Sequence, residues 1–311
     1  MPMKTATYSK IISPEDYNRI ITFEHLYISA SDRVIKELIE TYKPTDRTAE
    51  VVEIGCGPAR ILPLIAQISD IHLTGIDHDS EFVRYAQSEI SSLGDDVHVI
   101  QSDFISYIHP VKVDVFYSQG VHHHIGKGEP TKVYLSAVVS QLTKDGVYIV
   151  SDEFLPEYKD EKDRKLKAVI WYSHVIASAK RIGQEYLAQE EAKTLLDDLY
   201  EVEKAGNELK SHEQIELVLR HCTTIDDFAR SGEIKLANEK AARFLDELSL
   251  LENRNISGDN TIDLSRGDYK ISDSIFRKEM NQAGLEVIER RTIGPVDTIG
   301  GMAVYVTKPK L

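Results

Sequence analysis

The chain has 311 residues, of which 41% are hydrophobic and 28% are charged. These proportions are typical of a globular protein and exclude a wholly disordered or fibrous chain. Acidic residues outnumber basic ones by 51 to 37, which gives a formal net charge of -14 at pH 7. Because such a field repels a phosphate backbone, we do not expect a nucleic acid partner.

The sequence lacks the features that mark exported and membrane proteins. Its two cysteines, Cys56 and Cys222, lie far apart and do not form the pattern of a disulfide framework. Residues 1–13 contain no apolar core of a signal peptide, and no apolar run approaches the roughly 20 residues that span a bilayer. We therefore expect a soluble, cytoplasmic protein without a membrane partner.

The first half of the chain predicts helices followed by an α/β pattern. Residues 14–42 carry apolar side chains at helical spacing, which predicts one or two helices that end before Pro44. The pattern then predicts strands at 51–54, 71–76, 97–100, 113–117 and 147–150, with helices at 59–68, 80–91 and 129–142. This alternation predicts βαβ crossovers and a parallel sheet with helices on both faces.

After Glu153 the pattern becomes helical. Residues 166–182 carry two apolar stripes, which indicates a helix buried on both sides. A second helix begins near Leu187 and is expected to end at Gly206. The spacing of Ser211 and Gln214 resembles a capping box at the start of a third helix.

The last helix of this helical stretch is expected at residues 234–251. It is amphipathic, and its apolar stripe offers a surface for a homodimer. Residues 253–268 are polar and contain glycine, which predicts a loop and a hinge. Ser272 is expected to cap a helix that ends at Gly284.

Two final strands, at 285–292 and 302–307, lie too close in sequence for a crossover helix and predict an antiparallel hairpin. The sequence thus divides into a helical segment at 1–48, an α/β domain at 49–155 and 269–311, and a helical cap at 156–268.

The strand at 51–54 runs into a tight turn that contains Gly55 and Gly57. Glycines there let the backbone approach a ligand closely and expose N–H groups at the start of a helix. A dinucleotide site would have a third glycine where this chain has Arg60. Glu53 suits a cationic amine or sulfonium ligand better than an anionic pyrophosphate.

Polar residues also end the next strands. Asp77 follows the second strand, where an acid commonly holds ribose hydroxyls. Asp103 and Phe104 follow the third, where a carboxylate can accept from an adenine amine beside an aromatic ring. The fourth strand ends at Gln119, close to a run of three histidines.

Together these motifs resemble those of the class I S-adenosylmethionine-dependent methyltransferases. The resemblance rests on Glu53 to Gly57, Asp77, Asp103 with Phe104, and the stretch from Asp114 to His124. It implies a Rossmann-like, doubly wound, mostly parallel seven-stranded sheet with a terminal hairpin. It also implies S-adenosylmethionine as the cofactor, bound across the carboxyl ends of the first four strands.

By position, the resemblance also assigns the parts of the cofactor to residues. The methionine part would border Glu53, Gly55, Cys56 and Gly57, and the ribose would lie by Asp77. The adenine would lie by Asp103 and Phe104, and the amino acid end by Ser118 and Gln119, with His78 as a further cofactor-binding residue. Other interpretations stay open. Asp77 could cap a helix, Asp103 and Phe104 could be turn and core residues, and Cys56 could be a small buried spacer.

The histidine run, His122, His123 and His124, resembles a metal cluster, but consecutive side chains point in divergent directions. We therefore expect no metal. One imidazole could act as a base or orient the substrate, or all three could be structural. Glu153, after Asp152 at the end of the fifth strand, is a further candidate base.

Trp171, Tyr172 and His174 lie on the helix with two apolar faces. They are packing residues, or they line a substrate pocket if the insertion is a lid. The leading hypothesis is in-line methyl transfer to a small molecule in a lidded pocket. Two alternatives remain: an enzyme that transfers or cyclises the aminobutyrate arm and releases methylthioadenosine, and a non-catalytic module that binds the cofactor.

Overall fold

The computed structural model describes residues 9, 12–24, 26–125, 128–199, 212–255 and 269–310. The strands are β1 (Ala49–Ile54), β2 (Ile71–Asp77), β3 (Val97–Gln101), β4 (Val113–Gln119), β5 (Leu142–Phe154), β6 (Leu285–Ile293) and β7 (Gly301–Pro309). The helices are α1 (Pro14–Glu24), α2 (Ile28–Tyr42), α3 (Leu62–Ile65), α4 (Ser80–Glu89), the 3-10 helix η2 (His122–His124), α5 (Glu129–Gln141), α6 (Glu161–Arg181), α7 (Glu185–Leu199), α8 (His212–Arg230), α9 (Ile234–Asn255) and α10 (Asp273–Gln282).

All seven strands belong to one sheet, in the order β3-β2-β1-β4-β5-β7-β6. The strands from β3 to β5 pair in parallel, and β7 pairs antiparallel with both β5 and β6. The mostly parallel seven-stranded sheet with its terminal hairpin is therefore confirmed. The strand order reverses between β1 and β4, and open α/β sheets bind ligands beyond the carboxyl ends of strands at such a point.

Helices cover both faces of the sheet because successive strand residues point to opposite sides. Val51 packs in one core with residues of α2, α3 and α4, whereas Val52 packs in the other with residues of α5 and α10. Both valines are fully buried. This double cover explains why the strands read as near-continuous apolar runs.

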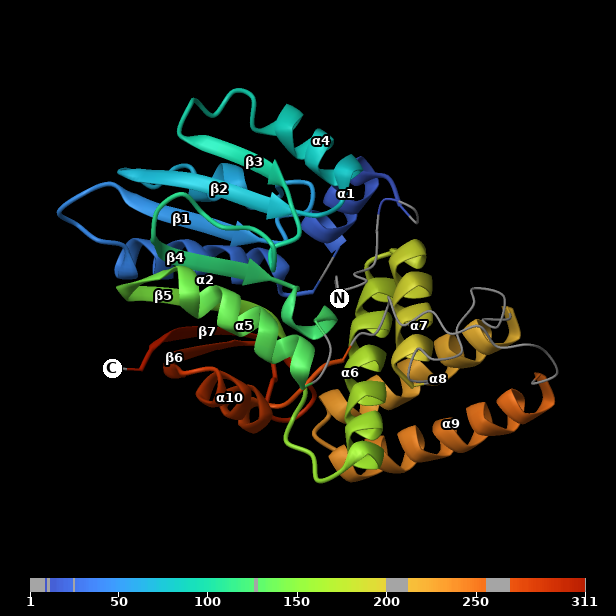
Figure 1. The fold of residues 1–311 in the computed structure, drawn as a ribbon. Helices are drawn as coiled ribbons and strands as arrows, with labels where there is room; N and C mark the ends of the chain where they lie inside the picture. The colour runs from blue at the N-terminus through green and yellow to red at the C-terminus, as the bar shows by residue number, and fades with distance from the viewer. Residues whose placement is uncertain are drawn as a thin grey trace.

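Helices α6, α7, α8 and α9 follow β5 and form an all-helical insertion, as expected. Figure 1 shows them beyond the carboxyl ends of the parallel strands. They enclose a hydrophobic core of their own, to which Trp171, Leu195, Val218 and Phe244 contribute. Helix α6 is buried on more than one side, because the adjacent Trp171 and Tyr172 are both fully buried.

Some elements differ from the sequence prediction. The helix expected at 59–68 is only the short α3, because the glycine turn continues through Ala59, which has a φ of 62°. β5 begins at Leu142, earlier than expected. Gly206, Ser211 and residues 256–268 lie outside the described residues. No helix in the described part of the chain is long and apolar enough to cross a membrane.

Candidate functional site

The turn after β1 is shaped by two glycines. Gly55 has a φ of +70° and Gly57 a φ of +51°, in the left-handed region that other residues adopt at a cost. Space is also short at Gly55, where an added Cβ would come within 2.6 Å of Val121 Cγ2. The turn therefore lies tightly against the segment after β4 and requires glycine at this position.

Asp77, the last residue of β2, connects this turn to the start of α4. Its Oδ2 accepts a hydrogen bond from the N–H of Gly57 at 2.9 Å, and its Oδ1 accepts from the N–H of Asp79 at 2.8 Å. Burial raises the pKa of Asp77, although the two backbone donors and His78 oppose the increase. The cap of α4 is Asp79, which accepts from the N–H groups of Glu81 and Phe82.

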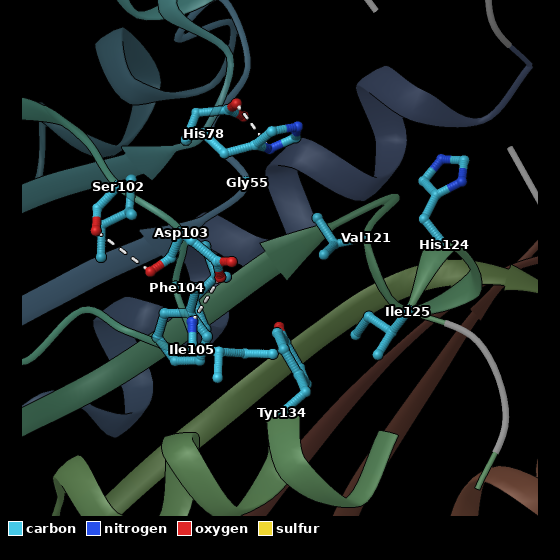
Figure 2. Close-up of a pocket in the computed structure, with 13 residues that line it drawn as sticks. Gly55, His78, Ser102, Asp103, Phe104, Ile105, Val121, His124, Ile125 and Tyr134 are labelled. Atoms are coloured by element: carbon cyan, nitrogen blue, oxygen red, sulfur yellow. Dashed lines mark hydrogen bonds and ion pairs between the residues drawn. The ribbon is translucent and has the colours of Figure 1, made fainter. Parts of the chain in front are cut away.

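A pocket open to solvent lies at the carboxyl ends of β1, β2, β3 and β4; its empty volume of about 490 Å³ includes open solvent at the mouth. Figure 2 shows residues that follow all these strands around it, with Tyr134 reaching it from α5. Its lining consists of Ile54, Gly55, Ile76, Asp77, His78, Ser102, Asp103, Phe104, Ile105, Val121, His124, Ile125 and Tyr134. The structure thus brings together Gly55, Asp77, His78, Asp103 and Phe104 of the residues selected from the sequence for the cofactor.

The lining combines apolar surface with a few polar groups. The ring centroid of Phe104 lies 5.6 Å from that of Phe116 and 5.3 Å from that of Tyr134. These contacts hold the ring of Phe104 in place. The carboxylate of Asp103 accepts from the N–H of Ile105 at 2.9 Å. An aromatic surface beside fixed carboxylates fits a nucleoside such as adenosine, whose flat base carries an amine and whose ribose carries hydroxyl groups.

Two residues of the β1 turn lie deeper in the protein. Glu53 is buried and accepts a hydrogen bond from the hydroxyl of Tyr117 at 3.1 Å. Burial raises its pKa well above the usual range, and it does so for the thiol of Cys56 as well. A thiol with a raised pKa is a poor nucleophile, which fits a packing role for Cys56.

Ser118 and Gln119, at the end of β4, are absent from the pocket lining. The hydroxyl of Ser118 lies 2.8 Å from that of Tyr148, which lies 2.8 Å from that of Tyr134. This chain of hydroxyls connects Ser118 indirectly to the pocket.

Gln119 belongs instead to a network under the glycine turn. Its Nε2 donates to Asp32 of α2 at 2.9 Å, and its Oε1 accepts from Arg60. Both terminal nitrogens of Arg60 also bind the carboxylate of Asp32, at 2.5 and 2.7 Å. The side chain of Arg60 thus points to α2, and it fastens the turn to that helix.

The three histidines of η2 point in different directions. His122 is buried against Phe276, and its Nε2 lies 3.1 Å from Glu279 Oε2 of α10. His124 contributes to the pocket lining, and Figure 2 shows it on the far side of Val121 from Asp103.

His123 forms a close pair with Asp152 of β5. Its Nδ1 is hydrogen-bonded to Asp152 Oδ1, and its backbone N–H donates to Oδ2 at 3.1 Å. Burial opposes ionisation of Asp152, but the charge and hydrogen bond of His123 outweigh it and lower the pKa of the carboxyl. The ring of His123 lies 3.9 Å from that of His124, between centroids. The pair therefore adjoins the pocket.

Glu153, the neighbouring carboxylate, forms a different contact. Its Oε2 lies 2.9 Å from Nζ of Lys270, which is only 1% exposed. The ammonium group also donates to the hydroxyl of Tyr172 on α6. Lys270 was not predicted from the sequence. The one feature that could have drawn attention to it is its position just after the polar stretch at 253–268, where the α/β pattern resumes.

Trp171 and His174 of α6 lie at a contact with the N-terminal segment. Nδ1 of His174 lies 2.7 Å from Asp226 Oδ1, and its Nε2 lies 3.1 Å from the hydroxyl of Tyr27. Trp171 is fully buried against Gly300. Neither side chain, nor that of Tyr172, is part of the lining of the pocket.

Across the ranges that the structure describes, no three His, Cys, Asp or Glu side chains come close enough together to hold a metal ion. Cys56 and Cys222 are both free and buried.

Comparison with known sequences identifies the family to which this chain belongs. A sequence-family model described as a methyltransferase domain matches residues 45–206, more than half of the chain. The chain belongs to the class I S-adenosylmethionine-dependent methyltransferases. The match includes β1 to β5 and every strand end that lines the pocket. No curated protein matches the sequence.

Two of the similar solved structures, both of low sequence identity, share this fold with TM-scores above 0.5. An S-adenosylmethionine-dependent methyltransferase from Clostridium acetobutylicum is 10% identical, with a TM-score of 0.52, over 98% of this chain and 100% of that one. The [4+2]-cyclase SpnF is 11% identical, with a TM-score of 0.52, over 100% of both chains. The mitomycin 7-O-methyltransferase MmcR is 12% identical, with a TM-score of 0.47; 98% of this chain is covered but only 64% of that one, less than two thirds of its length.

Proposed function

We propose that this transferase moves the methyl group of S-adenosylmethionine to a nitrogen or oxygen atom of a small molecule. The observation that carries the proposal is the buried pair of His123 and Asp152 beside a pocket suited to adenosine. The pair lies where β4 and β5 end, and the neighbouring His124 lines the pocket itself. A proton acceptor and a nucleoside pocket at one edge of the sheet are what methyl transfer to a protonated nucleophile requires.

The cofactor would be held by the strand ends of the pocket. Asp103 and Phe104 would bind the adenine, Asp77 the ribose hydroxyls, and the turn at Gly55 and Gly57 the methionine part. The common pocket supports this assignment, since Gly55, Asp77 and Asp103 all line it. When bound, the sulfonium cofactor supplies an electrophilic methyl carbon.

The chain itself contributes alignment and a proton acceptor. Because Nδ1 of His123 is bonded to Asp152, Nε2 is the nitrogen through which the ring would take the proton of the nucleophile. Asp152 stays ionised, since its pKa is lowered, and it would stabilise the imidazolium that forms. We assign this role to His123 and not to Glu153, because the carboxylate of Glu153 forms an ion pair with Lys270.

A small acceptor fits the position of the helical insertion. Helices α6 to α9 stand beyond the carboxyl ends of the strands (Figure 1), and a lid there would align two reactants and exclude water. A net charge of -14 also disfavours a nucleic acid acceptor. We therefore infer that residues 156–268 are a cap over the reaction site.

The experiment that tests this function uses S-adenosylmethionine carrying an isotope label in its methyl group. Purified protein is incubated with the cofactor and fractionated metabolite pools, and labelled products are identified by mass spectrometry. We expect label in a small molecule, and a large loss of its formation in His123→Ala and in Asp152→Asn. Label found only in protein or nucleic acid, or undiminished transfer by both variants, would exclude the proposal.

A further inference from the structure

The neighbouring carboxylates at the end of β5 have separate partners. Asp152 contacts His123, whereas Glu153 forms an ion pair with Lys270 at 2.9 Å. Successive side chains of a strand point to opposite faces, so the two carboxylates are directed to different neighbours. Each is buried or nearly so, with side-chain exposures of 2% for Asp152 and 11% for Glu153.

Lys270 is the cation of this arrangement. Its side chain is 1% exposed, donates to the hydroxyl of Tyr172, and lies 4.5 Å from the centroid of the same ring. A buried ammonium group is costly unless a counter-charge and hydrogen bonds compensate it. Glu153 and Tyr172 provide both, which ties α6 of the cap to the end of β5.

The backbone around Lys270 joins the same groups. The N–H of Tyr269 donates to the carbonyl oxygen of His123 at 2.9 Å. Ile271 forms a parallel bridge with Phe154, and its carbonyl oxygen accepts from the N–H of Leu155 at 3.0 Å. The segment that returns from the cap therefore runs beside both β5 and the histidine run.

We propose that Lys270 is a positioning residue for methyl transfer, which neutralises Glu153 so that Asp152 is the carboxylate that sets the charge and orientation of His123. This inference rests on the proposed role of His123 as the base. An unpaired Glu153 carboxylate would add a second negative charge one residue along β5 from Asp152, whose carboxylate is hydrogen-bonded to the imidazole. That charge would make the imidazolium a weaker proton donor. Lys270 would prevent this without touching the substrate.

Several charged or titratable groups face this region. Asp152 approaches His123 from β5, while His122 and His124 flank it on η2. Glu279 of α10 reaches the run through His122. Among the described residues, Glu153 and Lys270 form a further pair, and α6 contributes the titratable Tyr172.

The test is a titration of the His123 imidazole by NMR in four proteins: wild type, Lys270→Met, Glu153→Gln, and the double variant Glu153→Gln/Lys270→Met. Resonances are assigned with His123→Asn. Loss of the cation should raise the pKa of His123 by roughly half to one unit, and loss of the carboxylate should lower it by a similar amount. The double variant removes both charges and should return the pKa to near the wild-type value.

Equal pKa values of His123 in all four proteins would overturn the proposal and leave Lys270 a purely structural residue. If Lys270→Met does not fold, the comparison of Glu153→Gln with the double variant still decides between the two roles. A purely structural Lys270 would not return the pKa of His123 to its wild-type value in the double variant. Lys270→Arg keeps the charge and should retain the wild-type titration.

This titration needs no acceptor, so its outcome is separate from that of the proposed function. Without labelled product from the wild type, the proposed function fails even where the four titrations differ. With product, the acid limb of kcat/KM should move with the pKa of His123 in each variant, while the affinity for S-adenosylmethionine stays constant. Product with an unmoved acid limb would count against Lys270 as a positioning residue.

Discussion

The N–H of Gly57 donates a hydrogen bond to Oδ2 of Asp77 at 2.9 Å and thereby joins the turn after β1 to the end of β2. The same carboxylate lines the pocket. Asp77 therefore has two roles, since it holds the glycine turn in place and would present an acceptor to the cofactor. Substitutions at this residue should affect the binding of the cofactor through both.

Asp77→Ala should weaken the binding of S-adenosylmethionine by about 1.5–3 kcal/mol, because it removes a charged acceptor. Asp77→Asn should cost less, since its amide oxygen can still accept from Gly57. Isothermal titration calorimetry measures both affinities, with Asp96→Asn, whose side chain is 74% exposed, as the control. Wild-type affinity in both Asp77 variants would show that this carboxylate does not bind the cofactor.

Glu53→Gln should stabilise the free protein increasingly as the pH rises. Burial raises the pKa of Glu53 well above its unfolded value of about 4.3, so its contribution to stability is full below that value and is lost as the pH rises through the folded pKa. Glutamine does not ionise, so the Glu53→Gln variant does not lose stability in this way as the pH rises.

Thermal unfolding at pH 5 and pH 8 checks this prediction. The gain in Tm of Glu53→Gln over wild type should be larger at pH 8, whereas Glu286→Gln, on the exposed part of β6, should show no such trend. A gain that does not grow with pH would contradict a raised pKa of Glu53.

Arg60→Met should destabilise the fold by on the order of 3 kcal/mol, because it leaves the carboxylate of Asp32 in a nearly buried site without its cation. The side chains of this pair are only 10% and 12% exposed. Arg84→Met, which breaks a surface pair of 74% and 48% exposure with Glu81, should cost less than about 1 kcal/mol. Urea unfolding gives both values, and similar small losses would refute the importance of the buried pair.

Cofactor binding should increase hydrogen-exchange protection in part of the helical insertion, in particular in α6. A ligand shifts a conformational equilibrium only if it contacts one state better than the other. Strands β1 to β5 are protected by burial already and should change much less. Identical exchange of α6 to α9 with and without S-adenosylmethionine would mean that the insertion is a rigid cap, not a moving lid. The apolar stripe of α9, expected from the sequence to offer a surface for a homodimer, is instead buried inside the insertion, where Ala237, Ala241 and Phe244 are fully buried.

Much of the fold followed from local patterns in the sequence. The strands around Val51 and Val115 are buried on both faces, so each reads as an apolar run, and Gly55 marks the point where the first one turns. The face of β4 on which Ser118 lies could also be predicted, because alternation along the strand places it on the same side as Phe116, toward α5. The lengths of the elements were harder to predict. Helix α3, for example, begins later than expected because Ala59 adopts a left-handed conformation.

The partners of the polar residues did not follow from local patterns. Which histidine meets Asp152 depends on how η2 packs against β5 and α10, and consecutive residues offer no signal for this choice. Lys270 and Glu153 meet because the chain returns from the insertion beside β5. Such contacts are set by tertiary packing, so sequence reasoning could name the carboxylate but not its cation.

The measurement that tests the central claim most directly is the identity of the sulfur-containing product after turnover of S-adenosylmethionine with its acceptor. Methyl transfer releases S-adenosylhomocysteine, and transfer or cyclisation of the aminobutyrate arm releases methylthioadenosine. Liquid chromatography with mass spectrometry separates the two. We expect S-adenosylhomocysteine in equal amount to the methylated small molecule, and methylthioadenosine as the main product would contradict methyl transfer.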